Sequence, residues 1–249
     1  MSGSRSLIRS NVEFDFLTNR DVEILELICE FGGKTFVDVL EKTLWYGRSS
    51  AKRQVQNRIT ILKDKYKIIR LVPTGLMSPR NAIALTENGA RYINEYTDFK
   101  VPFFRPAFTT IYHTIYEQIA YYWLKKSGRN VSRTAVIEWR NENKHTPDLI
   151  YHHNQNISKP VYVEIELSRK ENKRYTDIFA NMESDGAYAV LYIFKDERSM
   201  KFGGHWLPLY DKIYITNIDF IVESISSDKK LKLFSQKEFL KKFPKKNKK

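Results

Sequence analysis

Two glutamates alternate with apolar residues in the segment KPVYVEIELSRK, residues 159–170. At the two-residue period of a β-strand, the valines and the isoleucine face one side, whereas Glu164 and Glu166 face the other. The two carboxylates then lie about 6.6 Å apart, two strand rises, and at an effective dielectric constant of about 20 they repel by about 2.5 kcal/mol. On an open sheet face this pair is simply hydrated. In a cleft it requires a cation, a proton or a basic neighbour.

A histidine and a glutamate stand four residues apart in TTIYHTIYEQIAYYWLKKSG, residues 109–128. This spacing places His113 and Glu117 on the same face of a helix. The segment is apolar almost all round, which is typical of a buried helix, and polar side chains there need partners. The pair either satisfies itself or contributes a base and a ligand to a functional site.

The elements that must position these side chains follow in the order helix, three strands, helix, strand, with one more strand after them. Asp148 stands at the start of the second strand, directly after Pro147. The apolar segment YAVLYIF suits a sheet that is buried on both faces. The expected strands are 133–140, 146–153, 159–168, 188–194 and 212–222, and the expected helix is 174–186.

The first part of the chain predicts three helices, two short strands and a fourth helix. Thr18 and Asp21 have the spacing of a capping box, and Gly32-Gly33 ends the first helix. Ser49-Ser50 can cap the third helix, Thr86 caps the fourth, and Gly89 permits close packing. The expected helices after the first are 35–46, one starting after Ser50, and one after Thr86, and the expected strands are 67–72 and 82–86.

The third helix has two different sides. Its apolar stripe consists of Val55, Ile59, Leu62 and Tyr66. The opposite side is basic and rich in amides. A helix with one apolar, buried side and one basic, amide-rich side is typical of a recognition helix in a DNA major groove. The loop between the two strands would then be a wing, from which Arg80 reaches phosphate or the minor groove. A protein-binding module is the alternative for this unit. The candidate DNA-binding residues are Lys52, Arg53, Gln56, Asn57, Thr60 and Arg80.

Positive charge is concentrated in two segments. The chain carries a formal net charge of +13, of which residues 51–70 contribute +6 and residues 229–249, with ten lysines and one glutamate, contribute +9. Such concentration indicates a polyanionic partner, most simply nucleic acid. The alternative for the Lys-rich tail (residues 229–249) is a disordered end that keeps the chain in solution.

Several other classes of protein are disfavoured. The single Cys29 allows neither an intrachain disulfide nor a cysteine zinc site, and it suits a buried core thiol in a reducing, cytoplasmic compartment. No apolar run reaches the roughly 18 residues of a membrane span, and the first residues lack the apolar core of a signal peptide. Glycine patterns for nucleotide cofactors are absent. His145, His152 and His153 lack the partners of a zinc site and are expected at the surface.

The second part of the chain resembles the PD-(D/E)XK restriction-endonuclease-like nucleases. The resemblance lies in a helix with an acid, a strand beginning after Pro147-Asp148, and Glu164-Ile165-Glu166 on the next strand. It implies that Asp148 and Glu164 bind Mg²⁺ or Mn²⁺ and that Glu117 completes the site. The sequence departs from the family where Glu166 occupies the position of its lysine. Three alternatives follow from this departure. Lys170 or Lys173 supplies the amine that the family lysine would provide, or Glu166 binds metal instead. In the third alternative the nuclease-like fold binds DNA without cleaving it.

The whole chain resembles the MobC-type relaxases of mobilisable plasmids and integrative elements. LTNRDVEILELICEF and LTENGARYI look like the winged helix of the replication-relaxation family, and the nuclease-like motifs follow. The implied fold is mixed α and β: a winged helix-turn-helix domain, then a restriction-endonuclease-like mixed-sheet domain. The implied function is site-specific nicking of one DNA strand at a transfer origin. The expected divisions are 1–98 (winged helix), 99–106 (linker), 107–228 (nuclease-like domain) and 229–249 (Lys-rich tail).

Phosphodiester cleavage needs a nucleophile, a Lewis acid on the phosphate and charge stabilisation of the leaving oxygen. Carboxylate oxygens suit the hard ions Mg²⁺ and Mn²⁺. Water is the preferred nucleophile, oriented or deprotonated by His113; a tyrosine such as Tyr116, Tyr121 or Tyr122 is the alternative. The expected metal ligands are Glu117, Asp148, Glu164 and Glu166. The candidate catalytic residues are His113, Glu117, Asp148, Glu164, Glu166 and Lys170.

A second interpretation is a DNA-binding protein without catalysis, acting as a replication initiator, a regulator or a relaxosome accessory. Both interpretations predict DNA as the partner, at a transfer origin or an operator-like site, and both are compatible with other conjugation proteins as partners and with a homodimer. Neither predicts a membrane partner.

Overall fold

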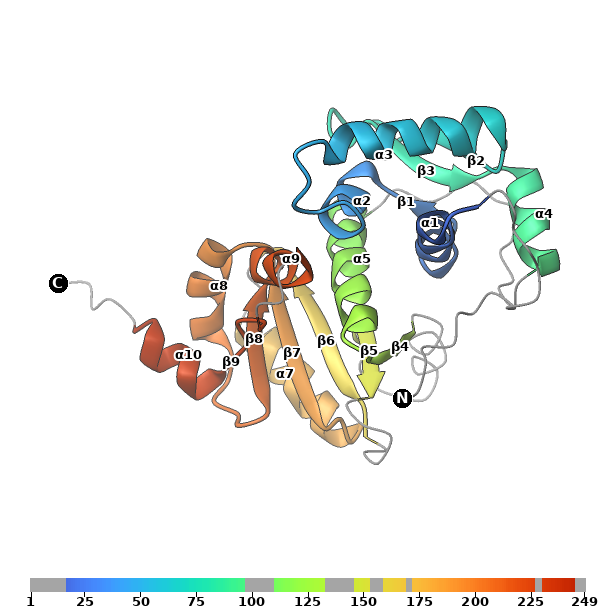
Figure 1. The fold of residues 1–249 in the computed structure, drawn as a ribbon. Helices are drawn as coiled ribbons and strands as arrows, with labels where there is room; N and C mark the ends of the chain where they lie inside the picture. The colour runs from blue at the N-terminus through green and yellow to red at the C-terminus, as the bar shows by residue number, and fades with distance from the viewer. Residues whose placement is uncertain are drawn as a thin grey trace. The chain divides into compact units, whose positions relative to one another are not determined.

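The computed structural model describes residues 17–96, 110–132, 146–152, 159–168, 172–226 and 230–244 (Figure 1). It is a mixed α+β structure that divides into two compact units, Met1–Gln118 and Ile119–Lys249. The border falls inside helix α5 (Ile111–Lys126), so this helix has residues in both units. The expected linker 99–106 lies outside the described residues.

Unit 1 combines helices with a small antiparallel sheet whose strand order is β1-β3-β2. The expected two strands and the helix after Thr86 are confirmed within one or two residues at their ends. Its elements are α1 (Asn19–Glu30), β1 (Lys34–Thr35), α2 (Val37–Thr43), α3 (Ala51–Thr60), the π-helical turn η1 (Ile61–Lys65), β2 (Ile69–Pro73), β3 (Asn81–Leu85) and α4 (Glu87–Tyr96).

The N-terminus of α1 is held by the expected capping box and by an ion pair that the sequence did not reveal. Thr18 accepts a hydrogen bond from the backbone of Asp21, and the Asp21 carboxylate accepts one from the backbone of Thr18. Arg58 of α3 donates to both oxygens of the same carboxylate. Asp21 is fully buried. The pair therefore fixes α3 against the start of α1.

Strand β1 replaces the first residues of the helix expected at 35–46, which begins only at Val37. Gly32 and Gly33 adopt positive φ angles of 66° and 83°, and they reverse the chain after α1. Thr35 then pairs with Ile83 of β3. The β-branched Thr35 is buried in this sheet. Its pairing with a distant strand therefore outweighs the local pattern that predicted a helix at this position.

Gly89 allows α4 to pack closely, as expected. Thr86 accepts a hydrogen bond from the Gly89 backbone at 3.0 Å, which caps α4. A Cβ atom at Gly89 would lie 2.0 Å from the carbonyl oxygen of Ile68. Only glycine fits this position without moving backbone.

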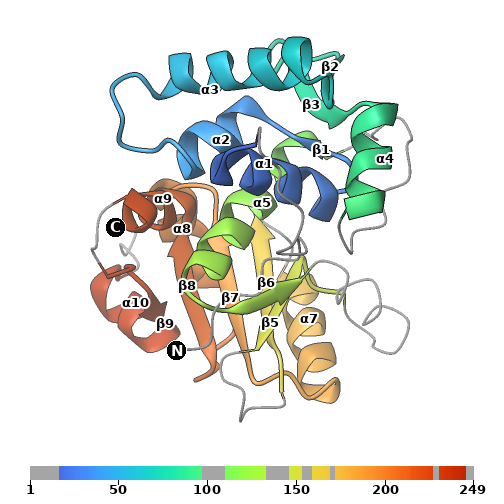
Figure 2. The same cartoon turned by 45° about the vertical axis from the view of Figure 1, so that its right-hand side comes forward.

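Unit 2 contains a six-stranded mixed sheet of order β4-β5-β6-β7-β8-β9, in which β6, β7 and β8 are parallel and the other neighbours are antiparallel. Helix α7 covers one sheet face, as Figures 1 and 2 show. After α5 the elements are β4 (Asn130–Ser132), β5 (Leu149–His152), β6 (Val161–Glu166), α7 (Asn172–Ser184), β7 (Ala189–Phe194), α8 (Glu197–Gly203), the 3-10 turn η2 (Gly204–Trp206), β8 (Ile213–Asn217), α9 (Ile218–Ser226), β9 (Phe234–Ser235) and α10 (Gln236–Lys242).

The strand expected at 212–222 is wrong in its second half. β8 ends at Asn217, and α9 begins at the next residue. The Asn217 side chain accepts a hydrogen bond from the Phe220 backbone at 2.9 Å, which is the geometry of a helix N-cap. The asparagine thus ends the strand and starts the helix. The strand expected at 133–140 lies outside the described residues.

Part of the Lys-rich tail is folded into unit 2. Strand β9 pairs with β8, and Ser235 and Glu238 form a capping box at the start of α10. Phe239 is fully buried in the core of the unit, and the Lys242 ammonium lies 4.6 Å from the centre of the Phe234 ring. The phenylalanines between the lysines explain why the alternative of a disordered end does not hold for the described part of the tail, because they bury apolar area while the lysine heads stay in water.

Two further expectations concern the chain as a whole. Cys29 is half-buried on α1, and burial, with Glu30 and Glu26 nearby, raises the pKa of its thiol to about 12. The thiol therefore stays protonated, as expected of a structural cysteine. Among the described helices, none has the length and apolar character needed to cross a membrane.

Candidate functional site

Asp148 lies beside the two glutamates of β6. It directly precedes β5, which pairs antiparallel with β6 through Leu149↔Val163. One Asp148 carboxylate oxygen accepts a hydrogen bond from the Ile165 backbone at 2.7 Å. Ile165 stands between Glu164 and Glu166, so this bond ties the aspartate to the middle of the Glu-Ile-Glu sequence. This bond joins the aspartate to the backbone of β6, and the convergence of the three carboxylate side chains stays a prediction.

Glu164 and Glu166 are buried, with 4% and 3% of their surface exposed. The hydrated sheet face considered from the sequence is therefore wrong. β6 lies between β5 and β7, and the face that carries the glutamates also carries Tyr162, which packs in the apolar core with Tyr175 of α7. Removing a carboxylate from water costs on the order of several kcal/mol per ion. Two of them on one buried face demand strong compensation.

Tyr192 of β7 belongs to the same cluster. The parallel register pairs Glu164 with Tyr192, so the two side chains are neighbours on one sheet face. Tyr192 is fully buried. Its pKa is held well above the usual value for a tyrosine, first by burial and then by the charges of Glu164 and Glu166, with a smaller effect of Asp148. Within the described part of the chain, its hydroxyl has no hydrogen-bond partner.

Helix α5 supplies the expected histidine and glutamate. His113 Nδ1 lies 3.3 Å from Glu117 Oε1, and Glu117 is 4% exposed. One potential ligand atom from each of His113, Glu117 and Asp148 lies within 4.8 Å of the other two. Among the described residues, this grouping of potential ligand atoms includes neither Glu164 nor Glu166.

The donor set fits a hard divalent cation. Asp148, Glu164 and Glu166 offer oxygen atoms from adjacent strand positions, and oxygen ligands are those that Mg²⁺ and Mn²⁺ prefer. The buried Tyr192 hydroxyl lies on the same sheet face as Glu164, and no described residue forms a hydrogen bond with it. Lys170, the expected amine, lies outside the described residues, and Lys173 is exposed at the start of α7.

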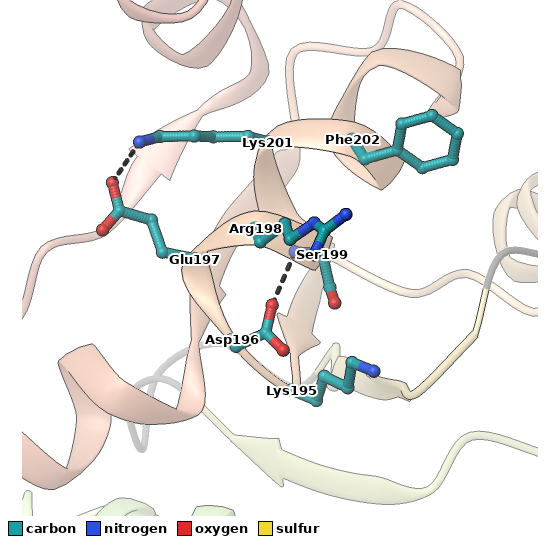
Figure 3. Close-up of a pocket in the computed structure, with 7 residues that line it drawn as sticks. All are labelled: Lys195, Asp196, Glu197, Arg198, Ser199, Lys201 and Phe202. Atoms are coloured by element: carbon teal, nitrogen blue, oxygen red, sulfur yellow. Dashed lines mark hydrogen bonds and ion pairs between the residues drawn. The ribbon is translucent and has the colours of Figure 1, made fainter.

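A pocket of about 960 Å³ opens where β7 ends and α8 begins (Figure 3). The Lys195 backbone donates a hydrogen bond to the Glu166 carbonyl at 3.3 Å, so the pocket adjoins the carboxyl end of β6. In Figure 3, Lys201 pairs with Glu197 on one side of α8, and Lys195 and Arg198 point away from that pair. These two cations can attract an anionic strand next to the carboxylates.

The structure places every candidate DNA-binding residue at the surface of unit 1. Val55, Ile59 and Leu62 form the buried side of α3 and η1, as the apolar stripe predicted, and Tyr66 is half-buried. Arg58 is turned inward to Asp21. The exposed residues on α3 are Lys52, Arg53, Gln56, Asn57 and Thr60, and Arg80 is exposed between β2 and β3.

The candidate tyrosine nucleophiles on α5 differ in accessibility. Tyr121 and Tyr122 are buried, with 2% and 8% of their surface exposed, and Tyr116 is half-buried. A side chain must reach a phosphodiester to attack it, so burial disfavours Tyr121 and Tyr122 and leaves water as the preferred nucleophile.

Comparisons with protein-family models, with curated proteins and with solved structures found no match to this chain. The functional conclusion therefore depends on the residues and their geometry.

Proposed function

We propose that this chain is a metal-dependent DNA endonuclease whose active site is the carboxylate cluster of unit 2. The observation that carries the proposal is the hydrogen bond that ties Asp148 to the backbone of β6 at Ile165, between the buried Glu164 and Glu166. Buried carboxylates are usually paired with a cation or coordinate a metal, because an isolated buried charge is costly.

The order of the elements supports a PD-(D/E)XK-like fold for this unit. Helix α5, strands β4, β5 and β6, helix α7 and strand β7 follow one another as in the nuclease core that the sequence resembles. Asp148 precedes the second of these strands, and Glu164 lies near the end of the third. Glu117 comes from the helix before them. The resemblance assigns Glu117, Asp148 and Glu164 to the proposed active site.

When bound, the divalent ion would act as a Lewis acid on the scissile phosphate. The carboxylates of Asp148 and Glu164 would hold it, and Glu117 would add a ligand. His113, in contact with Glu117, would take the proton of the attacking water or fix the orientation of Glu117. Lys195 and Arg198 would hold the anionic strand beside the site.

Unit 1 supports recognition of double-stranded DNA. Its helices α1, α2 and α3, followed by the hairpin of β2 and β3, have the order of a winged helix-turn-helix domain. α3 presents a polar, basic face to solvent, and Arg80 lies in the hairpin loop. These features suit base contacts from a helix in the major groove and backbone contacts from a wing.

The particular function that both units support is that of a MobC-type relaxase. In this proposal unit 1 selects the site at a transfer origin, and unit 2 nicks one strand there. Other conjugation proteins and a second copy of the chain are the partners that such a reaction would involve.

Nicking of supercoiled plasmid tests the proposal. Wild-type protein is expected to convert plasmid that carries its transfer origin into the open-circular form with Mg²⁺ or Mn²⁺, and chelation by EDTA is expected to stop the reaction. Asp148→Asn should lower the rate at least about a hundredfold, because the metal supplies several kcal/mol of charge stabilisation. Asp177→Asn, an exposed change on α7, is the matched control. Equal nicking by wild type and Asp148→Asn would refute the proposal.

A DNA-binding protein without catalysis is the second candidate. Glu166 favours it, because a glutamate stands where the nuclease family has lysine. Specific DNA binding with no Mn²⁺ bound in calorimetry would support this candidate over the first.

DNA specificity is expected to depend on the exposed face of α3. Arg53→Ala and Asn57→Ala should each reduce the preference for the specific site over random DNA by about 1–3 kcal/mol, the usual value of a good base contact. Competition binding at fixed salt measures this preference. Lys237→Ala, an exposed change on α10, should leave the preference unchanged; if it alone reduced the preference, α3 would not be the recognition helix.

A further inference from the structure

The Tyr192 hydroxyl is a buried polar group whose role the proposed active site does not yet explain. Tyr192 is fully buried, and within the described part of the chain nothing accepts or donates a hydrogen bond to its hydroxyl. A buried tyrosine hydroxyl usually finds a partner, and an unsatisfied one destabilises the fold. The buried hydroxyl therefore calls for a partner that the described residues do not supply.

The surroundings of the ring fix where the hydroxyl lies. The ring centres of Tyr175, Phe179 and Phe194 lie 6.1, 5.9 and 6.4 Å from that of Tyr192. Such packing holds the ring in one orientation. Glu164 is its register neighbour on the adjacent parallel strand β6. The Tyr192 side chain therefore lies on the sheet face that carries Glu164 and Glu166.

A water molecule between the hydroxyl and the carboxylates would give the hydroxyl its hydrogen-bond partner. Ionised carboxylates only accept hydrogen bonds, whereas a phenol both donates and accepts. A water molecule can accept from the phenol and donate to a carboxylate. Mg²⁺ and Mn²⁺ sites suit this arrangement, because Mg²⁺ gives up its water reluctantly and usually keeps several molecules when bound to carboxylates.

We propose that Tyr192 is a positioning residue of the cation site, with its hydroxyl hydrogen-bonded to a water molecule in the hydration shell of a divalent ion held by Asp148, Glu164 and Glu166. This inference rests on the proposed function, because it requires the cation. Tyr192 is neither a metal ligand nor a nucleophile in this arrangement: it is too deeply buried to meet DNA. It acts by orienting the water and, through it, the ion.

The inference predicts opposite effects of Tyr192→Phe on metal binding and on the stability of the metal-free protein. Loss of an outer hydrogen-bond partner should weaken Mn²⁺ binding about tenfold, at the lower end of the range for such residues. Without metal, the same change removes an unsatisfied buried hydroxyl and keeps the packed ring, so the midpoint of urea unfolding should stay equal or rise. A residue that only filled the core would not give this combination.

The experiment titrates the full chain with Mn²⁺ alone, measured by calorimetry and by the electron spin resonance signal of the free ion, and records urea unfolding with EDTA present. Tyr151→Phe is the matched control. Tyr151 lies on β5, is also buried, and faces the other side of the sheet, because its neighbour Ile150 pairs with Tyr162 on the carboxylate side. The control should bind Mn²⁺ as the wild type does.

Each outcome decides a separate question. If the wild type binds no Mn²⁺, the proposed metal site fails and this inference fails with it. If the wild type binds Mn²⁺ and Tyr192→Phe binds it equally well, only the role of Tyr192 is refuted. Equal loss of affinity in Tyr151→Phe would make the effect one of general packing and overturn the proposal. Unfolding of metal-free Tyr192→Phe would also overturn it, because the hydroxyl would then have an essential partner within the protein.

Discussion

Glu164→Gln is expected to weaken Mn²⁺ binding and to lower the nicking rate, each at least about a hundredfold. The amide keeps the shape of the side chain but removes the charge that attracts the ion. A divalent ion contributes several kcal/mol of charge stabilisation in phosphoryl chemistry, and about 1.4 kcal/mol corresponds to a factor of ten in rate. Calorimetry with Mn²⁺ measures the affinity, and plasmid nicking measures the rate.

The same change should not destabilise the metal-free protein. It removes one of two carboxylates that repel each other across about 6.6 Å by about 2.5 kcal/mol. The urea midpoint in EDTA is therefore expected to stay equal or rise. Glu183→Gln, an exposed change on α7, is the matched control and should alter none of the three measurements. Wild-type Mn²⁺ affinity in Glu164→Gln would show that the ion binds elsewhere.

Arg58→Met is expected to destabilise unit 1 by about 3 kcal/mol. Methionine retains the apolar stem but leaves the Asp21 carboxylate, which is fully buried, without its guanidinium. Removing one partner of a buried ion pair costs about 3–5 kcal/mol, and the lower value applies because the Arg58 side chain is 19% exposed. Urea unfolding followed by circular dichroism measures the change.

Two control variants separate the effect of the Arg58–Asp21 ion pair from the general effect of replacing an arginine on α3. Arg53→Met, on the exposed side of the same helix, should change stability by less than about 0.5 kcal/mol. Adding Asp21→Asn to Arg58→Met should recover part of the loss, since the uncompensated charge disappears. An Arg58→Met variant as stable as Arg53→Met would mean that the pair contributes little to the placement of α3.

Local signals in the sequence were sufficient for most of unit 1. The capping box at Thr18 and Asp21, and the cap at Thr86, are contacts between residues three apart, so the sequence contains both partners. The apolar stripe of α3 likewise predicted its buried side. Strand β1 escaped prediction because Lys34 and Thr35 pair with residues about fifty positions away, and no local pattern records that pairing.

In the candidate site, too, local features could be predicted from the sequence, whereas features that depend on distant residues could not. Alternation showed that Glu164 and Glu166 share a face, but whether that face is covered depends on α7 and on the neighbouring strands. Tyr192 was read as one apolar residue of a buried strand; its place beside Glu164 follows from the register of β6 and β7. A tyrosine in an otherwise apolar strand was the available signal, since its hydroxyl needs a partner.

Strand β9 has a consequence for how copies of this protein meet. It is the last strand at its edge of the large sheet, it spans two residues, Phe234 and Ser235, and lysines flank it in the sequence. An incoming strand would find few backbone groups to bond and would meet positive charge. Sheet-to-sheet addition at this edge, the usual first step toward fibrils, is therefore blocked, and any dimer must use another surface.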